Sequence, residues 1–267
     1  MTVKHCERTI MKDKLRIWNS RRIERRRLKY QFRSTMDGFQ YKGIHSQFED
    51  SWEPLTRALV KAFSNYTLSF VNIGAHYGYY ACLAAQQGMK VTAFEPIDAN
   101  YQMLRDNIDT NNFLYDCRLI HAAVGDRSHL AKIYGAFSGA SLIPEMTKKS
   151  NSMYQITQVF ELSDFHLSSE PTLFLIDVEG YELNVLEGAR NHLADKSKNI
   201  WIVETTSKNS EEFSTKMLKH GYSLFHIGHK KLSAVTKQDI EKAGLDGNFL
   251  CIDLDQKQNS ELVEAFS

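Results

Sequence analysis

Three short stretches of the sequence each carry an apolar run that ends at a polar residue followed by glycine or proline. They are residues 70–80, 91–96 and 173–182, and they bring Asn72, Glu95 and Asp177 to or near the ends of these runs. Such a run is typical of a buried parallel strand that delivers a functional group to the carboxyl edge of a sheet. Because ligands bind at that edge in open α/β sheets, the three stretches together predict one ligand site.

The order of elements around these stretches predicts an α/β fold. Strand-like and helix-like segments alternate, which indicates βαβ units, a mostly parallel sheet and three α/β/α layers. We expect strands at 68–73, 90–94, 117–123, 172–177 and 199–204, and helices at 55–63, 78–87, 98–111, 181–191 and 211–220. A β-rich excursion is expected at 131–134 and 154–161. The closing strands, 222–227 and 248–254, have no long helix between them, so we expect them to be antiparallel.

The glycine turn after the first strand indicates a nucleotide site. A strand–turn–helix unit places backbone N–H groups beside a ligand, and we expect Gly74 to let the ligand approach the backbone. Gly78 is expected to let the helix start pack close to the strand. Many turns carry two such glycines for packing alone, so Glu95 is the stronger indication: a carboxylate there lies beside the turn and can accept hydrogen bonds from both hydroxyls of a ribose. The structural alternative is a solvated acid at a strand end.

The residues of the turn favour one cofactor over another. A dinucleotide site usually shows GxGxxG, whose bare backbone binds a pyrophosphate. Here Ala75, His76 and Tyr77 separate the two glycines. We therefore expect S-adenosylmethionine rather than a dinucleotide, and a dehydrogenase is the disfavoured alternative.

These motifs resemble those of the FkbM family of S-adenosylmethionine-dependent methyltransferases. The resemblance spans roughly residues 50–255 and is most specific at 176–182. The matching segments are 72–80, 93–96, 122–126, 176–182 and 248–250, with Asn100, Tyr101, Leu104, Asn107, Val185, Leu186, Gly188, Ala189, Gly221 and Tyr222. It implies a class I methyltransferase sheet, Rossmann-like and mostly parallel with an antiparallel last strand, and O-methylation of sugars, glycans or other small hydroxylated molecules. The predicted cofactor-binding residues are Asn72, Gly74, His76, Gly78, Glu95, Pro96, His121 and Ala123.

Two positions depart from the family pattern. The family usually has Asp and Asn where this chain has Asn72 and His76. The Asn72 side-chain oxygen can still accept a hydrogen bond from the amino group of the methionine part, but without a charge. A catalytically inactive binding protein with this fold is therefore an open alternative.

Asp177 and Glu179 are the predicted catalytic residues. Methyl transfer from a sulfonium to a hydroxyl depends mostly on alignment and exclusion of water, and a base must take the hydroxyl proton. For Glu179 the alternative is that it caps the helix expected to begin near Tyr181. We expect no metal; the minority alternative is Mg²⁺ held by Asp177 and Glu204. Residues 135–150 are expected to form either a lid over the acceptor or a surface loop.

Charge is concentrated at the N-terminus. Residues 1–33 contain 12 basic and three acidic side chains, whereas the whole chain has a net charge of only +1, so the remainder carries −8. We divide the chain into a basic extension, 1–50, with a weakly patterned helix at 11–33, and a methyltransferase domain, 51–267. Docking of the extension on the acidic remainder is favoured over nucleic-acid binding, so an RNA methyltransferase is the second choice. Peripheral contact with an anionic surface is also open.

The remaining sequence features predict a cytoplasmic protein. The four cysteines have no metal-ligand spacing and are expected to be reduced. No apolar stretch is long enough to cross a bilayer, and the N-terminus lacks the apolar core of a signal peptide. The expected partner is a small molecule or a glycan, and the sequence makes no prediction of oligomeric state.

Overall fold

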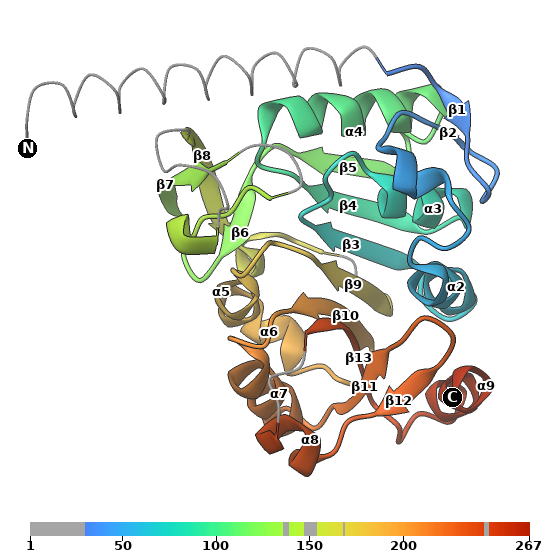
Figure 1. Ribbon diagram of the computed structural model, residues 1–267, viewed down its shortest axis with the longest axis vertical. Helices are drawn as coiled ribbons and strands as arrows, with labels where there is room; N and C mark the ends of the chain where they lie inside the picture. Colours follow the sequence, from blue (N-terminus) through green and yellow to red (C-terminus); the bar gives the residue numbers. More distant parts are fainter. Residues whose placement is uncertain (1–29, 136–138, 147–153, 168, 243–245) are drawn as a thin grey trace, which may run out of the picture.

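The computed structural model describes residues 30–267 apart from 136–138, 147–153, 168 and 243–245. Its centre is an eight-stranded sheet (Figure 1). In spatial order the strands are β12 (Leu232–Ala234), β11 (Ser223–Ile227), β13 (Gly247–Ile252), β10 (Asn199–Thr205), β9 (Thr172–Ile176), β3 (Ser69–Ile73), β4 (Lys90–Phe94) and β5 (Cys117–Ile120). β13 is antiparallel to both β10 and β11, which confirms the expected antiparallel closing strands. This is the class I methyltransferase arrangement.

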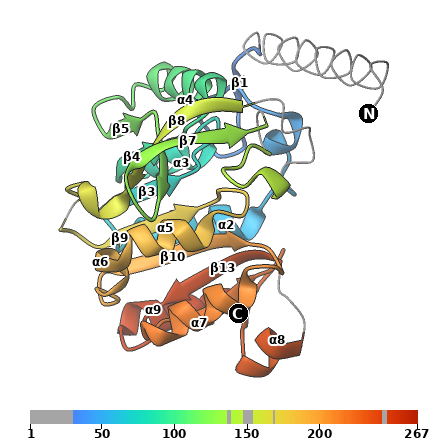
Figure 2. The ribbon, with the colours of Figure 1, turned by 90° about the vertical axis from the view of Figure 1, so that its left-hand side faces the viewer.

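Helices cover both faces of the sheet, because each central strand is apolar on both sides. Phe70, Leu173 and Leu175 belong to the core on one face, and Val71 and Phe174 to the core on the other. The first face carries α2 (Pro54–Phe63), α3 (Tyr79–Gln86), α4 (Asp98–Thr110) and α9 (Lys257–Phe266). The second carries α5 (Glu182–Gly188), α6 (Arg190–Leu193) and α7 (Ser210–Lys219), onto which Figure 2 looks directly. The result is the three-layer fold predicted.

The β-rich excursion is a separate three-stranded sheet. β6 (Ala123–Gly125), β8 (Tyr154–Glu161) and β7 (His129–Tyr134) form it, with β8 in the middle. The expected strand at 117–123 is therefore divided: it leaves the main sheet after Ile120, and the chain joins the second sheet from Ala123. A tight turn in which the Ala122 N–H donates to the Ile120 carbonyl (3.0 Å) separates the two parts.

Some helix boundaries differ from those expected. The helix expected at 181–191 is two helices, α5 and α6, that meet at Ala189. Asp98 does not cap α4 but is its first residue, where an acid is favourable to the helix dipole, and Ile97 is the N-cap. Gly88 ends α3 as expected: it has φ +82°, and the following N–H of Met89 donates back to the Ala84 carbonyl (3.1 Å). The sequence analysis missed α9, β12 and α8 (Lys237–Lys242).

The described part of the N-terminal segment packs on the sheet's first face. It contains only short elements, β1 (Arg33–Ser34), β2 (Gln40–Tyr41) and η1 (His45–Phe48), but Phe39 and Tyr41 are buried against Tyr79 of α3. The side chain of Asn107 in α4 joins this segment to the turn, because it donates to the carbonyls of Lys42 (3.0 Å) and Tyr77 (2.8 Å). The predicted boundary at residue 50 stays a prediction, and the helix expected at 11–33 lies almost wholly outside the described residues.

Two short 3₁₀ segments, η2 (Pro144–Met146) and η3 (Leu162–Asp164), complete the described structure. None of its helices is long and apolar enough to cross a membrane.

Candidate functional site

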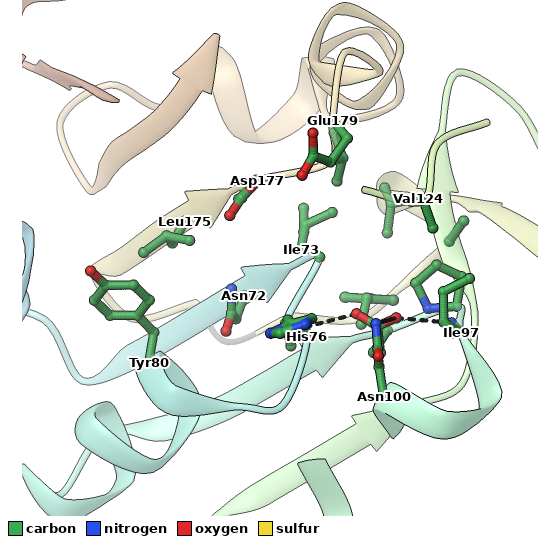
Figure 3. A pocket seen from close by; sticks show the side chains of 18 of the residues that line it. Asn72, Ile73, His76, Tyr80, Ile97, Asn100, Val124, Leu175, Asp177 and Glu179 are labelled. Atoms are coloured by element: carbon green, nitrogen blue, oxygen red, sulfur yellow. Dashed lines mark hydrogen bonds between the residues drawn. The ribbon is translucent and has the colours of Figure 1, made fainter. Parts of the chain in front are cut away.

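One pocket lies where β3, β4 and β9 end, at the point where the strand order reverses. β3 is parallel to β4 on one side and to β9 on the other. The chain continues from β3 to β4 and β5 on one side and then crosses back to β9 on the other side, so the connections diverge at β3 and a crevice opens there. Figure 3 shows Asp177 and Glu179 at one end of this pocket and Ile97 and Asn100 at the other. Eight of the ten predicted site residues line it: Asn72, Gly74, His76, Glu95, Pro96, Ala123, Asp177 and Glu179.

Glu95 is buried at the end of β4 and is held by three donors. Its Oε2 accepts the backbone N–H of His76 (2.7 Å), and its Oε1 accepts the N–H of Ile97 (2.9 Å) and the side-chain amide of Asn100 (3.2 Å). Burial raises its pKa to about 7, although the three donors oppose this shift. The carboxylate is therefore fixed beside the glycine bend and retains acceptor capacity for hydroxyl donors.

The glycine bend is closed by backbone bonds to β4. The N–H groups of Gly74 (3.0 Å) and Ala75 (2.9 Å) both donate to the Phe94 carbonyl, which brings the bend next to Glu95. Gly74 has φ +82°, and a Cβ there would lie 1.8 Å from the Asp177 carbonyl oxygen. We expected Gly74 to let a ligand approach the backbone, and it does line the pocket. The close contact that requires glycine is, however, with the backbone that follows β9.

Gly78 does not line the pocket, contrary to its predicted place in the cofactor site. It is the N-cap of α3 with φ +83°, and a Cβ there would lie 2.3 Å from Leu104 Cδ1 in α4. Its role is to let α3 and α4 pack closely, whereas the prediction was a close approach to the first strand.

His121 is also outside the pocket lining. Its ring stacks on Tyr101 (centroids 4.6 Å apart), and its Nε2 lies 3.1 Å from Asp98 Oδ1. It follows β5, where the turn into β6 directs Ala122 and Ala123 rather than His121 to the pocket.

His76 contributes its backbone to the site. It has φ +52°, a left-handed conformation, and this turns its N–H toward Glu95. Its ring stacks on Tyr77 with centroids 3.7 Å apart. The His76 backbone therefore joins the glycine bend to Glu95.

Two buried amide oxygens on the pocket wall have no hydrogen-bond partner in the structure. Asn72 and Asn100 are each 2% exposed, and their Oδ1 atoms accept no bond from the described residues. A buried acceptor without a partner is costly unless a ligand supplies the donor. Together with Glu95, these oxygens fit a ligand with hydroxyl and amino donors, as S-adenosylmethionine has.

The carboxyl groups at the other end of the pocket interact with each other. Asp177 forms a hydrogen bond with Glu204 near the end of β10. Asp177 is accessible from the pocket yet surrounded by protein. This desolvation, with the negative charges of Glu204, Glu179 and Glu53, raises its pKa well above the usual value. A carboxylate of raised pKa is a stronger base once it is deprotonated, which suits removal of a hydroxyl proton.

Glu179 has an unusual backbone conformation. It has φ +54°, and its carbonyl accepts the Ser141 hydroxyl (2.8 Å). The carboxylate that binds a backbone N–H of this turn is Glu182, which accepts from Gly180 (2.7 Å). Glu179 itself lines the pocket, and its capping role stays a prediction.

Part of the loop after β7 also lines the pocket. Ala140 and Leu142 reach it, and Ser141 is fixed by a backbone bridge to Tyr134. This described part of the predicted lid lies against the site, and the rest of that loop falls partly outside the described residues.

The sequence analysis missed the contribution of the segment before α2. Gln47, Trp52 and Glu53 line the pocket, and Tyr80 of α3 donates from its hydroxyl to Glu53 Oε2 (2.5 Å). Asn100 was predicted only as part of the family motif and not as a site residue. Nothing local marks Glu53, because its place depends on how a distant segment packs; for Asn100, its position five residues after Glu95 was an available signal.

No metal centre is evident in the part of the chain that the structure describes. There, no group of three or more His, Cys, Asp or Glu side chains is arranged to hold a metal ion. The Asp177–Glu204 pair is instead joined by its own hydrogen bond.

The comparisons with solved structures give distant likenesses to methyltransferases. An S-adenosylmethionine-dependent methyltransferase from Agrobacterium tumefaciens is 9% identical, with a TM-score of 0.46, covering 84% of this chain and 70% of that one. A putative O-methyltransferase from Klebsiella pneumoniae is 12% identical, with a TM-score of 0.44, covering 74% and 78%. Precorrin-6y C5,15-methyltransferase from Geobacter metallireducens is 11% identical, with a TM-score of 0.43, covering 74% and 87%. Nothing about the substrate follows from similarities this low.

The sequence comparison is more specific. No curated protein matches the chain significantly. The model of the methyltransferase FkbM domain matches residues 72–226, more than half of the chain, and this match contains the glycine bend, Glu95 and Asp177. The chain belongs to the FkbM family of methyltransferases.

Proposed function

We propose that this protein is an S-adenosylmethionine-dependent O-methyltransferase whose acceptor is a hydroxyl of a sugar, a glycan or another small molecule. The observation that carries the proposal is the pairing, in one pocket, of Glu95 at the glycine bend with Asp177 two strands away. The first suits a ribose and the second suits a hydroxyl that must lose its proton.

The nucleoside end is assigned to Glu95. Its Oε2 receives only the His76 N–H from the described residues, so it has capacity for a ribose hydroxyl. Ile97, Ala122 and Val124 provide apolar surface around that end for a base. Asn72 would bind the amino-acid end, because its orphaned oxygen needs a donor.

The reacting end is assigned to Asp177. When bound, the cofactor supplies a methyl group on a positively charged sulfur. Asp177 accepts the proton of the acceptor hydroxyl, and the hydrogen bond to Glu204 orients it. Trp52, Tyr80 and Leu142 exclude water from the same end of the pocket. Alignment and dehydration by these residues provide most of the acceleration that the reaction requires.

Carboxyl groups at the acceptor end support a small-molecule or glycan acceptor over a nucleic acid. Glu53, Asp177 and Glu179 line that end, and a phosphodiester would be repelled by them. The basic extension, residues 1–29 of which are outside the described structure, remains a proposed site of docking or of peripheral contact with an anionic surface.

The test is methyl transfer from labelled S-adenosylmethionine to a panel of glycans and small alcohols, followed by mass spectrometry. We expect a mass increase of one methyl group on a hydroxyl of at least one acceptor. Calorimetry with S-adenosylhomocysteine is the accompanying binding test. The absence of both a binding heat and a thermal shift would favour the inactive binding protein.

A further inference from the structure

Two carboxyl groups, those of Glu53 and Asp177, line the acceptor end of the pocket, and that of Glu204 lies beside Asp177 without lining the pocket. Glu53 precedes α2, Asp177 follows β9 and Glu204 lies near the end of β10. Asp177 and Glu204 are hydrogen-bonded, and Glu53 is close enough to both for its charge to affect Asp177 and to be affected by Glu204. We define these three residues as the carboxyl cluster.

The carboxyl cluster has no cation paired with it among the described residues. The charge of Arg57 lowers the pKa of Glu53, but its guanidinium pairs with Asp37 (Nε–Oδ2 3.3 Å) and donates to the Trp52 carbonyl (3.1 Å). Among the described residues, the Glu53 carboxylate accepts a hydrogen bond from the neutral Tyr80 hydroxyl. Burial and mutual repulsion raise the pKa values of Asp177 and Glu53, so a positive charge placed among them would be stabilised.

A second acceptor faces the same end of the pocket. Asn72 pairs in register with Leu175, and side chains two positions apart on a strand share a face, so Asn72 and Asp177 lie on the same face of the sheet. Asn72 is 2% exposed, lines the pocket and has an Oδ1 without a partner. Figure 3 places Asn72 between His76 and Asp177. The buried amide oxygen therefore needs an N–H or O–H donor from a ligand.

We propose that the carboxyl cluster and Asn72 form a subsite for a primary ammonium group, with Glu53 as the carboxylate that balances its charge. An ammonium group provides three donors and one positive charge, which the neutral Asn72 oxygen and the carboxyl cluster complement. A metal ion fits less well, because the described residues offer no metal-holding group of three ligands.

This subsite rests on the proposed function and deepens it. One source of the ammonium is the amino-acid end of the methyl donor: Glu53 would then supply the charge that Asn72 lacks. The other source is an acceptor that carries an amine. Glu53 lies outside residues 72–226, which the family model matches. With either source, the charge in the subsite therefore comes from the segment that precedes the matched domain.

The test compares two nucleosides by calorimetry on the full chain. 5′-Methylthioadenosine lacks the amino-acid end, whereas S-adenosyl-3-thiopropylamine carries a 3-aminopropyl group in place of its methyl group and so adds two methylenes and an amine. We expect the amine to bind more tightly, and Glu53→Gln to weaken its binding by about tenfold, the worth of a charge-assisted hydrogen bond. The affinity for methylthioadenosine should stay within about twofold, since the subsite does not touch the nucleoside.

Two further variants make the result decisive. Glu204→Gln removes an accessible member of the carboxyl cluster and should act in the same direction. Glu49→Gln, a change of the same kind at an exposed residue of the same segment, should alter neither affinity. If Glu53→Gln does not change the binding of the amine-bearing nucleoside, the protein saturated with S-adenosylhomocysteine is titrated with glucosamine and with glucose. A preference for glucosamine that Glu53→Gln abolishes assigns the ammonium to the acceptor.

The outcomes separate the two proposals. The ammonium subsite is wrong if Glu53→Gln and Glu204→Gln change neither the preference for the amine-bearing nucleoside nor the preference for glucosamine. It is also wrong if these variants weaken the binding of methylthioadenosine as much as that of the amine-bearing nucleoside. If the unmodified protein binds none of the nucleosides, the proposed function itself fails.

Discussion

The two ends of the pocket hold carboxyl groups of raised pKa in opposite ways. Glu95 is surrounded by donors from its own turn and from α4, and its pKa rises only to about 7. Asp177 is surrounded by other carboxyls, and its pKa rises well above the usual value. Desolvation by the surrounding protein raises both pKa values, so the difference comes from the partners. The first end is arranged for hydroxyl donors, and the second for a proton or a cation.

The largest expected effect is at the second end. Asp177→Asn should lower kcat by roughly 10²–10⁴-fold, because it removes the base while it keeps the shape of the side chain. The dissociation constant of S-adenosylhomocysteine should change by no more than about tenfold. Single-turnover methyl transfer and calorimetry measure the two quantities; equal losses in both would mean that Asp177 is only a binding residue.

The matching change at the first end is Glu95→Ala. It should weaken S-adenosylhomocysteine binding by about 2–4 kcal/mol, the worth of two charge-assisted hydrogen bonds. Asp109→Asn, at an exposed acid of α4, is the control and should leave the affinity unchanged. An unaltered dissociation constant in Glu95→Ala would separate Glu95 from the nucleoside.

The junction between the two ends is tested by Gly74→Ala. Gly74 and Gly88 both have φ +82°, but a Cβ at Gly74 would lie 1.8 Å from the Asp177 carbonyl oxygen, whereas one at Gly88 meets no atom within 4 Å. Gly88→Ala should therefore lower the free energy of unfolding by about 1 kcal/mol through the backbone conformation alone. Gly74→Ala should lower it by about 2–3 kcal/mol more. Urea unfolding measures both, and equal losses would show that the bend does not depend on contact with the backbone after β9.

The pH dependence of stability sharpens the same contrast. The pKa of Glu95 is about 7 in the folded protein and near the ordinary glutamate value when unfolded, so the folded state binds the proton more tightly. Its contribution to stability is full below the unfolded pKa and is lost as the pH rises toward 7. Glu95→Gln, which does not titrate, should flatten the decline in the free energy of unfolding between pH 5 and 7 by on the order of 2 kcal/mol. Chemical unfolding across that range checks this, and a decline as steep as that of the unmodified protein would contradict the raised pKa.

Sequence patterns predicted the residues whose positions depend on local structure. Glu95 and Asp177 each follow an apolar strand, and the parallel register of β3 with β4 and β9 brings those strand ends together without further information. The glycine bend was predicted for the same reason. What local patterns did not predict was the purpose of each glycine, because Gly74 and Gly78 are required by neighbours more than 25 residues away in sequence, Asp177 and Leu104.

The residues that were missed depend on packing between distant segments. Glu53 and Trp52 reach the pocket because the irregular segment before α2 packs on α3, where Trp52 contacts Tyr79 (centroids 4.7 Å apart). His121 lies outside the pocket lining because the chain changes sheets after β5, and nothing in the sequence from 117 to 123 marks that change.

The most direct test is a crystal structure of the protein with S-adenosylhomocysteine. We expect both ribose hydroxyls to lie within about 2.5–3.0 Å of the Glu95 carboxylate, and the amino group to lie next to Asn72 Oδ1. A nucleoside bound elsewhere, or bound in this pocket with its ribose away from Glu95, would contradict the account.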